Sequence, residues 1–198
     1  MAHESKNPVQ ASGMPANATV YLIRHAEKPD SGAALSPAGQ ARAAAYVQYL
    51  QRLTDRAGKM IQWNYLFASQ DSEKSDRPIL TITPLANALK KTIDSNYSDK
   101  AYTKLVDHVR SHAKDRYAHA NLLICWHHGE ILQLAQGLGA SPTDLPATSN
   151  WPAKWPGDVF GWLLKIRYKD DGSLHGDETE AINQHLMPDD ITDPAYNV

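Results

Sequence analysis

The chain has 198 residues, which is the length of one ordinary domain with its own hydrophobic core. Hydrophobic residues make up 42% of it and charged residues 21%, as in an average globular protein, and the net charge of −2 gives no general attraction to nucleic acid or anionic membranes. The single cysteine, Cys125, excludes an internal disulfide and a cysteine-only zinc site.

The beginning of the chain does not resemble a targeting segment. Residues 1–17 are polar, small and contain prolines, which predicts a flexible N-terminal arm. They include no apolar stretch of the kind found in a signal peptide, and the longest apolar run of the chain, Asn121–Trp126, is too short to cross a bilayer. We therefore expect a cytoplasmic protein with neither a membrane nor a nucleic acid as its partner.

A strand and a helix open the domain. Residues 19–23 (TVYLI) form a continuous run of the kind found in a buried strand. Ser36 and Pro37 are typical of a helix N-cap and of the first helical position. Apolar residues then recur at steps of three and four, which predicts a helix of about 18 residues closed by Gly58.

Strands and helices alternate through the rest of the chain. Residues 63–69 (WNYLFAS) predict a second strand, and residues 78–91 predict a helix that Pro84 kinks or breaks. The elements that follow are a helix over residues 102–113, a strand over Asn121–Trp126 and a short helix over residues 131–138. Residues 159–168 predict one more strand, which we expect at an edge of the sheet.

This alternation predicts an α/β fold, a three-layer αβα sandwich around a mostly parallel sheet. We expect the domain to cover residues 18–171. Residues 172–198 hold six acidic residues and no lysine or arginine, which predicts an acidic C-terminal tail that lies over the domain or extends from it. A proline-rich loop with Trp151 and Trp155 is expected to cover a sheet edge or to wall a substrate pocket.

Charged clusters follow three of the predicted strands. Arg24 and His25 end the first strand, Arg77 lies in the loop after the second, and residues 127–130 (HHGE) follow the third. Ligands of open α/β sheets bind beyond the carboxyl ends of the strands, so we expect these clusters to meet. Taken singly, the Arg24–His25 pair and Arg77 are more typical of solvated surface residues, and a histidine of the third cluster could simply pack.

Together these residue types predict a site for a phosphate dianion. A neutral imidazole is a nucleophile toward phosphorus, and an adjacent arginine lowers the imidazole pKa because like charges disfavour protonation. Guanidinium groups bind phosphate oxygens through paired hydrogen bonds. Arg77 precedes Pro78 at an expected helix N-terminus, where backbone dipoles also favour anions.

A metal site is the competing interpretation of the third cluster. His127, His128 and Glu130 are residue types that bind metals. Adjacent histidines rarely reach one ion, however, and the spacing differs from that of the H-E-x-x-H motif. We therefore expect no metal and no cofactor.

Four segments, in order along the chain, carry recognisable motifs. Residues 24–27 (RHAE) match R-H-[GA]-E, and residues 35–43 (LSPAGQARA) match L-[ST]-x-x-G-x-x-x-A. Residues 67–81 contain the end of a strand, a serine and R-x-x-x-T, and residues 125–129 (CWHHG) contain an H-G pair after an apolar strand. In this order they resemble the histidine phosphatase, or phosphoglycerate mutase-like, superfamily, and the resemblance implies the phosphoglycerate mutase-like fold.

The resemblance also implies an activity. His25 would be the nucleophile that becomes phosphohistidine, and Arg24, Arg77 and His128 would bind the phosphoryl group. His128 is assigned because a glycine follows it, with His127 as the alternative. The implied reaction transfers the phosphoryl group of a phosphomonoester, or of phosphohistidine, to His25 and then to water without a metal.

Three carboxylates are candidates for the proton donor of this reaction: Glu27, Glu130 and Asp99. Glu27 lies nearest the nucleophile in sequence, and its alternative role is an ion pair with Lys28 or Arg24. Lys28 in turn either adds substrate-binding charge at the rim of the pocket or is a solvated turn residue.

The implied partner is a small phosphorylated substrate or a phosphoprotein. The sequence lacks the proton-donor motif of mutase-like members and the long insertions of large mutases, which favours hydrolysis over mutase activity. Two other functions are compatible with the same residues: a phosphate- or phosphoprotein-binding module without catalysis, and a metal-dependent hydrolase.

Overall fold

The structure of the protein, a computed structural model, describes residues 13–194. Most of the predicted flexible arm, residues 1–17, lies outside the described residues, as do residues 195–198 of the acidic tail. Among the residues that the structure describes, no helix is both long and apolar enough to span a bilayer.

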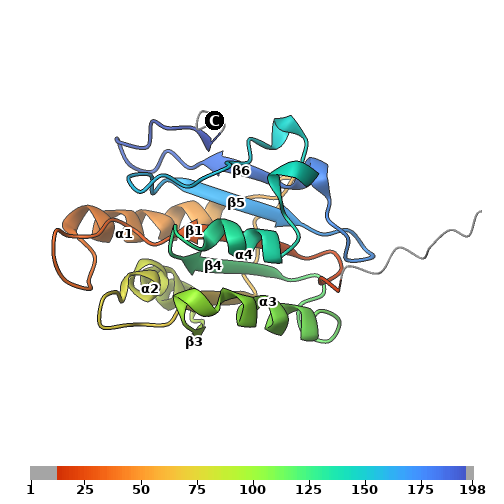
Figure 1. The fold of residues 1–198 in the computed structure, drawn as a ribbon, viewed down its shortest axis with the longest axis horizontal. Coiled ribbons are helices and arrows are strands. Elements are labelled where there is room, and N and C mark those ends of the chain that lie inside the picture. Colours follow the sequence, from red (N-terminus) through yellow and green to blue (C-terminus); the bar gives the residue numbers. More distant parts are fainter. Residues whose placement is uncertain (1–12, 195–198) are drawn as a thin grey trace, which may run out of the picture.

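A six-stranded mixed sheet forms the centre of the domain, in the order β3-β2-β4-β1-β5-β6 from bottom to top of Figure 1. The strands are β1 (Thr19–Arg24), β2 (Tyr65–Ser69), β3 (Ile93–Tyr97), β4 (Asn121–Trp126), β5 (Trp162–Arg167) and β6 (Glu180–Asn183). β1 to β4 are parallel, whereas β5 and β6 are antiparallel to their neighbours. The prediction of a mostly parallel sheet is therefore confirmed, with an antiparallel extension on one side.

Helices cover both faces of this sheet. They are α1 (Pro37–Arg52), α2 (Arg77–Leu89), α3 (Tyr102–Ser111) and α4 (Ile131–Gly137). Apolar side chains of α1 and α2, such as Tyr46 and Leu85, form one core with the sheet, and those of α3 and α4, such as Val109 and Leu134, form the other. This arrangement confirms the predicted αβα sandwich (Figure 1).

β1 and β4 lie side by side at the centre of the sheet, and every residue of β1 is buried. Successive side chains of β1 alternate between the two cores, as the pleat of a strand requires. A strand covered on both faces is apolar along its whole length, which made this strand recognisable. The register pairs Arg24 with Trp126, so the segments that start at His25 and His127 leave the sheet at the same edge.

Two strands, β3 and β6, were not predicted. β3 (IDSNY) is mostly polar and only half-buried at the sheet edge, so it lacks an apolar signal. β6 lies in the acidic segment after residue 172 and pairs with β5, so part of this segment belongs to the sheet. The prediction that residues 159–168 form an edge strand was wrong, because β6 covers that edge.

The predicted starts of α1, α3 and α4 hold, whereas the ends of the helices shift. Ser36 is the N-cap, and its Oγ accepts a hydrogen bond from the Gly39 amide at 3.1 Å. α1 ends at Arg52, and Gly58 lies in a later turn with a φ of 77°. Pro84 does not end α2, which continues through it for five more residues to its last turn.

The described part of the C-terminal tail packs on the domain. The indole N–H of Trp162 donates to the carbonyl of Thr192 at 2.7 Å, and the Asn183 amide donates to the carbonyl of Asp190 at 2.9 Å. Asp190 itself is only 8% exposed. The tail therefore contributes buried polar groups beside β5 and α1.

Candidate active site

His25 lies buried just beyond the end of β1. Its amide donates to the carbonyl of Trp126 at 3.0 Å, and its ring Nδ1 lies 2.7 Å from the carbonyl oxygen of Ala26. Because a carbonyl oxygen only accepts hydrogen bonds, this contact assigns the proton to Nδ1 and a lone pair to Nε2. Burial lowers the pKa of His25 to about 3, and His127 and Arg24 act in the same direction, so the ring is neutral at physiological pH.

Thr81 connects the loop after β1 to helix α2. Its Oγ1 accepts a hydrogen bond from the amide of Ala26 at 2.8 Å and donates one to the carbonyl of Arg77 at 2.7 Å. The four-residue spacing of R-x-x-x-T places Thr81 one helical turn after Arg77. One buried hydroxyl therefore fixes the neighbour of His25 and the first turn of α2 relative to each other.

The start of α1 packs against the same loop. The amide of Ser36 donates to the carbonyl of Glu27 at 3.0 Å. A Cβ atom at Gly39 would lie 2.4 Å from that carbonyl oxygen, so only glycine permits this contact. The glycine of the motif over residues 35–43 is thereby explained.

Arg77 is the first residue of α2 and is half-buried. Its Nη groups donate to the carbonyls of Gly32, Ala33 and Lys74 at 3.1, 3.2 and 3.2 Å. Its Nε is buried and has no hydrogen-bond partner among the described residues. Asp76 occupies the N-cap position, and its side chain makes no capping hydrogen bond to the first turn of the helix.

Arg24 is buried and held by the loop that precedes β5. Nη1 donates to the carbonyls of Val159 at 2.6 Å and Pro156 at 3.2 Å, and Nη2 donates to the carbonyl of Gly157 at 2.8 Å. The ring centroid of Phe160 lies 3.8 Å from the guanidinium carbon. Burial lowers the pKa of Arg24 to about 10, which leaves the group charged at neutral pH.

The two histidines after β4 have different neighbours. The ring of His127 stands edge-on to that of His25, with centroids 4.9 Å apart and an interplanar angle of 65°. Burial lowers the pKa of His127 to about 4, and Arg77 is the next cause. The pKa of His128 is also lowered by burial and then by Arg24. The structure therefore brings His127 against His25, whereas Nε2 of His128 lies beside Gly157, 3.8 Å from the position that a Cβ atom there would take.

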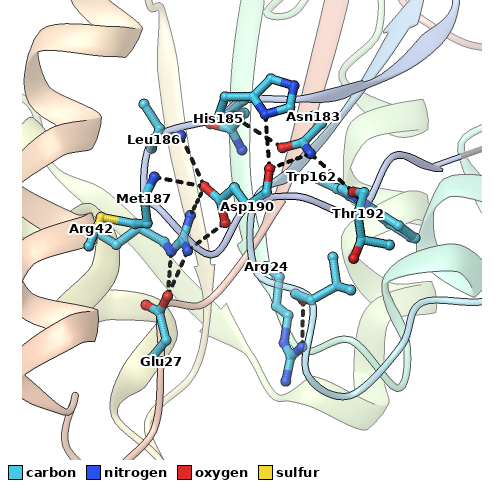
Figure 2. Close-up of polar contacts among 12 residues, drawn as sticks. Arg24, Glu27, Arg42, Trp162, Asn183, His185, Leu186, Met187, Asp190 and Thr192 are labelled. Carbon is cyan, nitrogen blue, oxygen red and sulfur yellow. Dashed lines mark hydrogen bonds and ion pairs between the residues drawn. The ribbon is translucent and has the colours of Figure 1, made fainter.

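Glu27 does not form an ion pair with Lys28 or Arg24, its expected partners. Its Oε1 accepts hydrogen bonds from Nε of Arg42 at 2.9 Å and from Nη2 at 2.6 Å. Arg42, on α1, also donates to both carboxylate oxygens of Asp190 at 2.8 Å. Figure 2 shows the guanidinium of Arg42 between the two carboxylates, so Glu27 is tied to the C-terminal tail through one arginine.

Arg42 and Asp190 were missed in the sequence. Arg42 lies on the same helix face as the buried residues Gly39, Ala43 and Tyr46. A charge within such a face indicates a buried ion pair, and this signal could have identified Arg42. Asp190 lies 148 residues away in the acidic tail and carries no comparable signal.

Asp99 and Glu130 form a pair of interacting carboxyl groups, and the charge of Glu130 also acts on the pKa of His127. Burial raises the pKa of Asp99 to about 7, and the neighbouring Glu130 acts in the same direction. Burial would raise the pKa of Glu130, but hydrogen bonds from Lys100 and Asp99 lower it. Asp99 is therefore the member of this pair that keeps its proton to the higher pH. The indole of Trp126 donates to the Asp99 carbonyl at 3.2 Å and fixes its backbone.

The structure also places Lys28 and the three residues of the alternative metal site. Lys28 is exposed, and its charge is one cause of the lowered pKa of His128. Within residues 13–194, no group of three or more histidine, cysteine, aspartate or glutamate side chains is arranged to hold a metal ion. His127, His128 and Glu130 are therefore not arranged as such a group.

Seven buried side-chain polar atoms lack a hydrogen-bond partner among the described residues, and five of them belong to the residues of this site. They are Arg24 Nε, Arg77 Nε, His128 Nδ1, Glu27 Oε2 and Asp99 Oδ1. Buried polar groups without partners are rare in folded proteins, so their concentration at one end of the sheet indicates a place for a polar ligand. The two guanidinium N–H groups favour an anion.

No protein-family model matches the sequence. No curated protein matches it either. Among solved structures, the chain is similar to phosphoglycerate mutase from Bacillus anthracis, with 14% identity over 86% of this chain and 95% of that one and a TM-score of 0.52. Phosphoserine phosphatase from Entamoeba histolytica, in complex with 3-phosphoglyceric acid, is 13% identical over 86% of this chain and all of its own (100%), with a TM-score of 0.51.

A third similar structure is phosphoglycerate mutase from Plasmodium falciparum, with 12% identity over 83% of this chain and 94% of that one and a TM-score of 0.51. At identities this low, the structural similarity shows the fold alone, and the activity has to be argued from the residues of the site. The chain has the phosphoglycerate mutase-like α/β fold. The resemblance to the histidine phosphatase superfamily that the motifs carried is thereby confirmed at the level of the fold.

Proposed function

We propose that this chain, which shares its fold with phosphoglycerate mutases and a phosphoserine phosphatase, is a phosphatase that forms a phosphohistidine intermediate on His25. The observation that carries the proposal is the combination of a neutral, oriented His25 ring with the unpaired buried Nε–H groups of Arg24 and Arg77. The substrate is a phosphomonoester or phosphohistidine, presented by a small molecule or by a protein.

In the first step, Nε2 of His25 attacks the phosphorus atom. The N–P bond forms as the bond from phosphorus to the leaving atom breaks. The carbonyl of Ala26 holds the Nδ1 proton, so the nucleophile needs no separate base. The N–H groups of Arg24 and Arg77 stabilise the charge on the phosphoryl oxygens.

Asp99 supplies the proton that the leaving group needs. Its pKa, raised to about 7, leaves a substantial fraction of Asp99 protonated at neutral pH, and a general acid must start in that form. In the second step a water molecule attacks the phosphohistidine, its proton passes to the Asp99 carboxylate, and the N–P bond breaks. Phosphate leaves, and His25 and Asp99 return to their starting protonation states.

The contacts of Glu27 and Glu130 favour structural roles for these two carboxylates. Glu27 accepts two hydrogen bonds from Arg42, which supports its use as an anchor of the loop after β1. Glu130 accepts from Lys100 and has a lowered pKa. Of the three candidates, Asp99 therefore fits the role of proton donor best.

The second histidine of the site is proposed to be His127. The sequence favoured His128 because Gly129 follows it. The ring contact of His127 with His25, and the effect of Arg77 on its pKa, support His127 as the residue that donates to the phosphoryl group. His128 and Lys28 would then bind the remainder of the substrate.

Hydrolysis is proposed over mutase activity. The sequence contains neither the proton-donor motif of mutase-like members nor the long insertions of large mutases. We therefore propose water as the acceptor of the phosphoryl group.

The test is phosphate release from p-nitrophenyl phosphate in the presence of EDTA, together with quenching of the enzyme in alkaline detergent during turnover, because an N–P bond survives alkali and not acid. We expect metal-independent turnover and an acid-labile phosphoenzyme, both lost in His25→Ala while the thermal unfolding temperature is unchanged. Phosphate binding without turnover on a broad panel of phosphomonoesters would instead identify a binding module. Loss of turnover on chelation would identify a metal-dependent hydrolase.

A further inference from the structure

Arg24 is held in an unusual way for an arginine offered to an anion. Three of its Nη hydrogen bonds are already made to the backbone carbonyls of Pro156, Gly157 and Val159. The Phe160 ring covers the guanidinium at 3.8 Å. Of the three guanidinium nitrogens, only Nε lacks a hydrogen-bond partner among the described residues.

Arg77 shows the same arrangement on the opposite side of the loop after β1. Its Nη groups donate to backbone carbonyls, and its buried Nε is unpaired. Two arginines that come from different elements and reach different loops thus leave the same atom available. This agreement argues that the Nη contacts position the side chains rather than block them.

We propose that the loop over residues 156–160 is the positioning element of Arg24, and that Phe160 is the residue through which it fixes Nε–H as the donor to the phosphoryl group. This inference rests on the phosphatase function proposed for His25. Phe160 contacts both Arg24 and His25: its ring lies over the guanidinium of Arg24, and its ring centroid is 6.1 Å from that of His25. An aromatic ring over a guanidinium holds its plane, and a fixed plane fixes the direction of the Nε–H bond.

The loop itself is anchored, as a positioning element must be. The carbonyl of Val159 accepts a second hydrogen bond from the indole of Trp155 at 2.8 Å. Trp155 is buried and packs on Trp162 of β5, with ring centroids 5.3 Å apart. The loop over residues 156–160, which binds Arg24, is therefore anchored to the core of the sheet. The Nε–H donor of Arg24 is thus oriented before substrate arrives.

The first experiment replaces the ring and keeps an apolar side chain. Phe160→Leu is expected to lower kcat/KM for p-nitrophenyl phosphate about tenfold, with a similar weakening of inhibition by tungstate. Phe160→Tyr retains the ring and is expected to keep both values. Lys154→Ala, at an exposed position two residues before this loop, is the control and is expected to behave as wild type. Phe160→Met serves in place of the leucine variant if the latter does not fold.

A double-mutant cycle separates a positioning role from a general structural one. If Phe160 acts through Arg24, then Phe160→Leu should cause no further loss in an Arg24→Ala background. Arg24→Lys should be as impaired as Arg24→Ala, because lysine cannot present a fixed Nε–H within the loop over residues 156–160. A Phe160→Leu enzyme with normal kcat/KM, or losses that multiply in the double variant, would overturn the inference. Absence of turnover in the wild-type protein would overturn the phosphatase proposal instead, so the two failures are distinct.

Discussion

Thr81 of α2 accepts a hydrogen bond from the amide of Ala26 at 2.8 Å, although 55 residues separate the two in sequence. The same hydroxyl donates to the carbonyl of Arg77. His25 precedes Ala26, so one side chain links the proposed nucleophile to the helix that begins with a proposed phosphate ligand. Both contacts are made by the hydroxyl group of Thr81, so this link depends on the hydroxyl and not on the methyl group.

Thr81→Val should therefore affect both stability and activity. The amide of Ala26 loses its acceptor, so we expect the free energy of unfolding to fall by about 1–3 kcal/mol in urea titrations. We expect kcat/KM for p-nitrophenyl phosphate to fall at least about tenfold, because the loop that carries His25 is released from α2. Thr81→Ser keeps the hydroxyl group, so its free energy of unfolding and its kcat/KM should stay close to the wild-type values.

Thr83 offers a matched control on the same helix. Its hydroxyl donates to the carbonyl of Ile79 at 2.7 Å, a bond within one helix. Thr83→Val should change the free energy of unfolding by less than about 0.5 kcal/mol and leave kcat/KM unchanged. Equal effects of the two valine variants would show that the link through Thr81 has no special role.

The comparison of sequence and structure separates local signals from distant ones. Arg24, His25 and Arg77 could be predicted because they follow apolar strands whose carboxyl ends meet at one edge of the sheet. The backbone carbonyls that bind Arg24 could not be predicted, since they lie 132 to 135 residues away in sequence. Every residue has a backbone carbonyl, so the sequence does not indicate which ones bind a side chain. β3 was missed because an edge strand with polar residues lacks an apolar run.

The C-terminal tail gives the second prediction, through the pair of Arg42 with Asp190. Asp190→Ala removes one of the two carboxylates that neutralise a buried guanidinium. Breaking a buried ion pair leaves an uncompensated charge, so we expect the free energy of unfolding to fall by about 3 kcal/mol. Glu180→Ala is the control, because Glu180 pairs with Lys165 while its side chain is 42% exposed, and its loss should cost less than about 1 kcal/mol.

The pH dependence of this contribution follows from the direction of the shift. Burial would raise the pKa of Asp190, but the hydrogen bonds from Arg42 and from the amides of Met187 and Leu186 lower it. A carboxyl whose folded pKa lies below its unfolded value of about 3.9 stabilises the fold above that value and loses this effect as pH falls through the folded pKa. The difference in stability between wild type and Asp190→Ala should therefore be constant near pH 7 and shrink below about pH 4. A difference that persists unchanged at pH 2 would contradict the ion-pair interpretation.

The third prediction concerns the pH profile of the reaction. His25, with a pKa lowered to about 3, stays neutral across the physiological range and causes no fall in rate between pH 5 and 7. Asp99 must be protonated to act as the acid, and its pKa is raised to about 7. We therefore expect kcat/KM to be level on the acid side of pH 7 and to decline as pH rises above it.

Two variants assign this decline to Asp99. Asp99→Asn should remove the basic limb and slow the hydrolysis of alkyl phosphates, whose leaving groups need a proton, more than that of p-nitrophenyl phosphate. Glu130→Gln removes a neighbouring charge that raises the pKa of Asp99, so the limb should move to lower pH. Because burial is the larger cause, it should not return to the value of a solvated aspartate. A basic limb that survives in Asp99→Asn would assign the titration to another group.

The last prediction distinguishes the two histidines that follow β4. His127 lies against His25, and its pKa, lowered to about 4, keeps it a neutral N–H donor at pH 7. His127→Asn should therefore reduce kcat by about 100-fold or more, the loss expected when one donor to a transition-state oxygen is removed. His128→Asn should reduce kcat less than about tenfold and act mainly on KM, because Nε2 of His128 lies beside Gly157, in the loop that holds Arg24. Rapid-quench measurement of phosphoenzyme formation, with thermal unfolding to verify the fold, decides between them. If His128→Asn proves the more damaging in kcat, the glycine that follows His128 was the better guide and the ring contact of His127 is a packing contact.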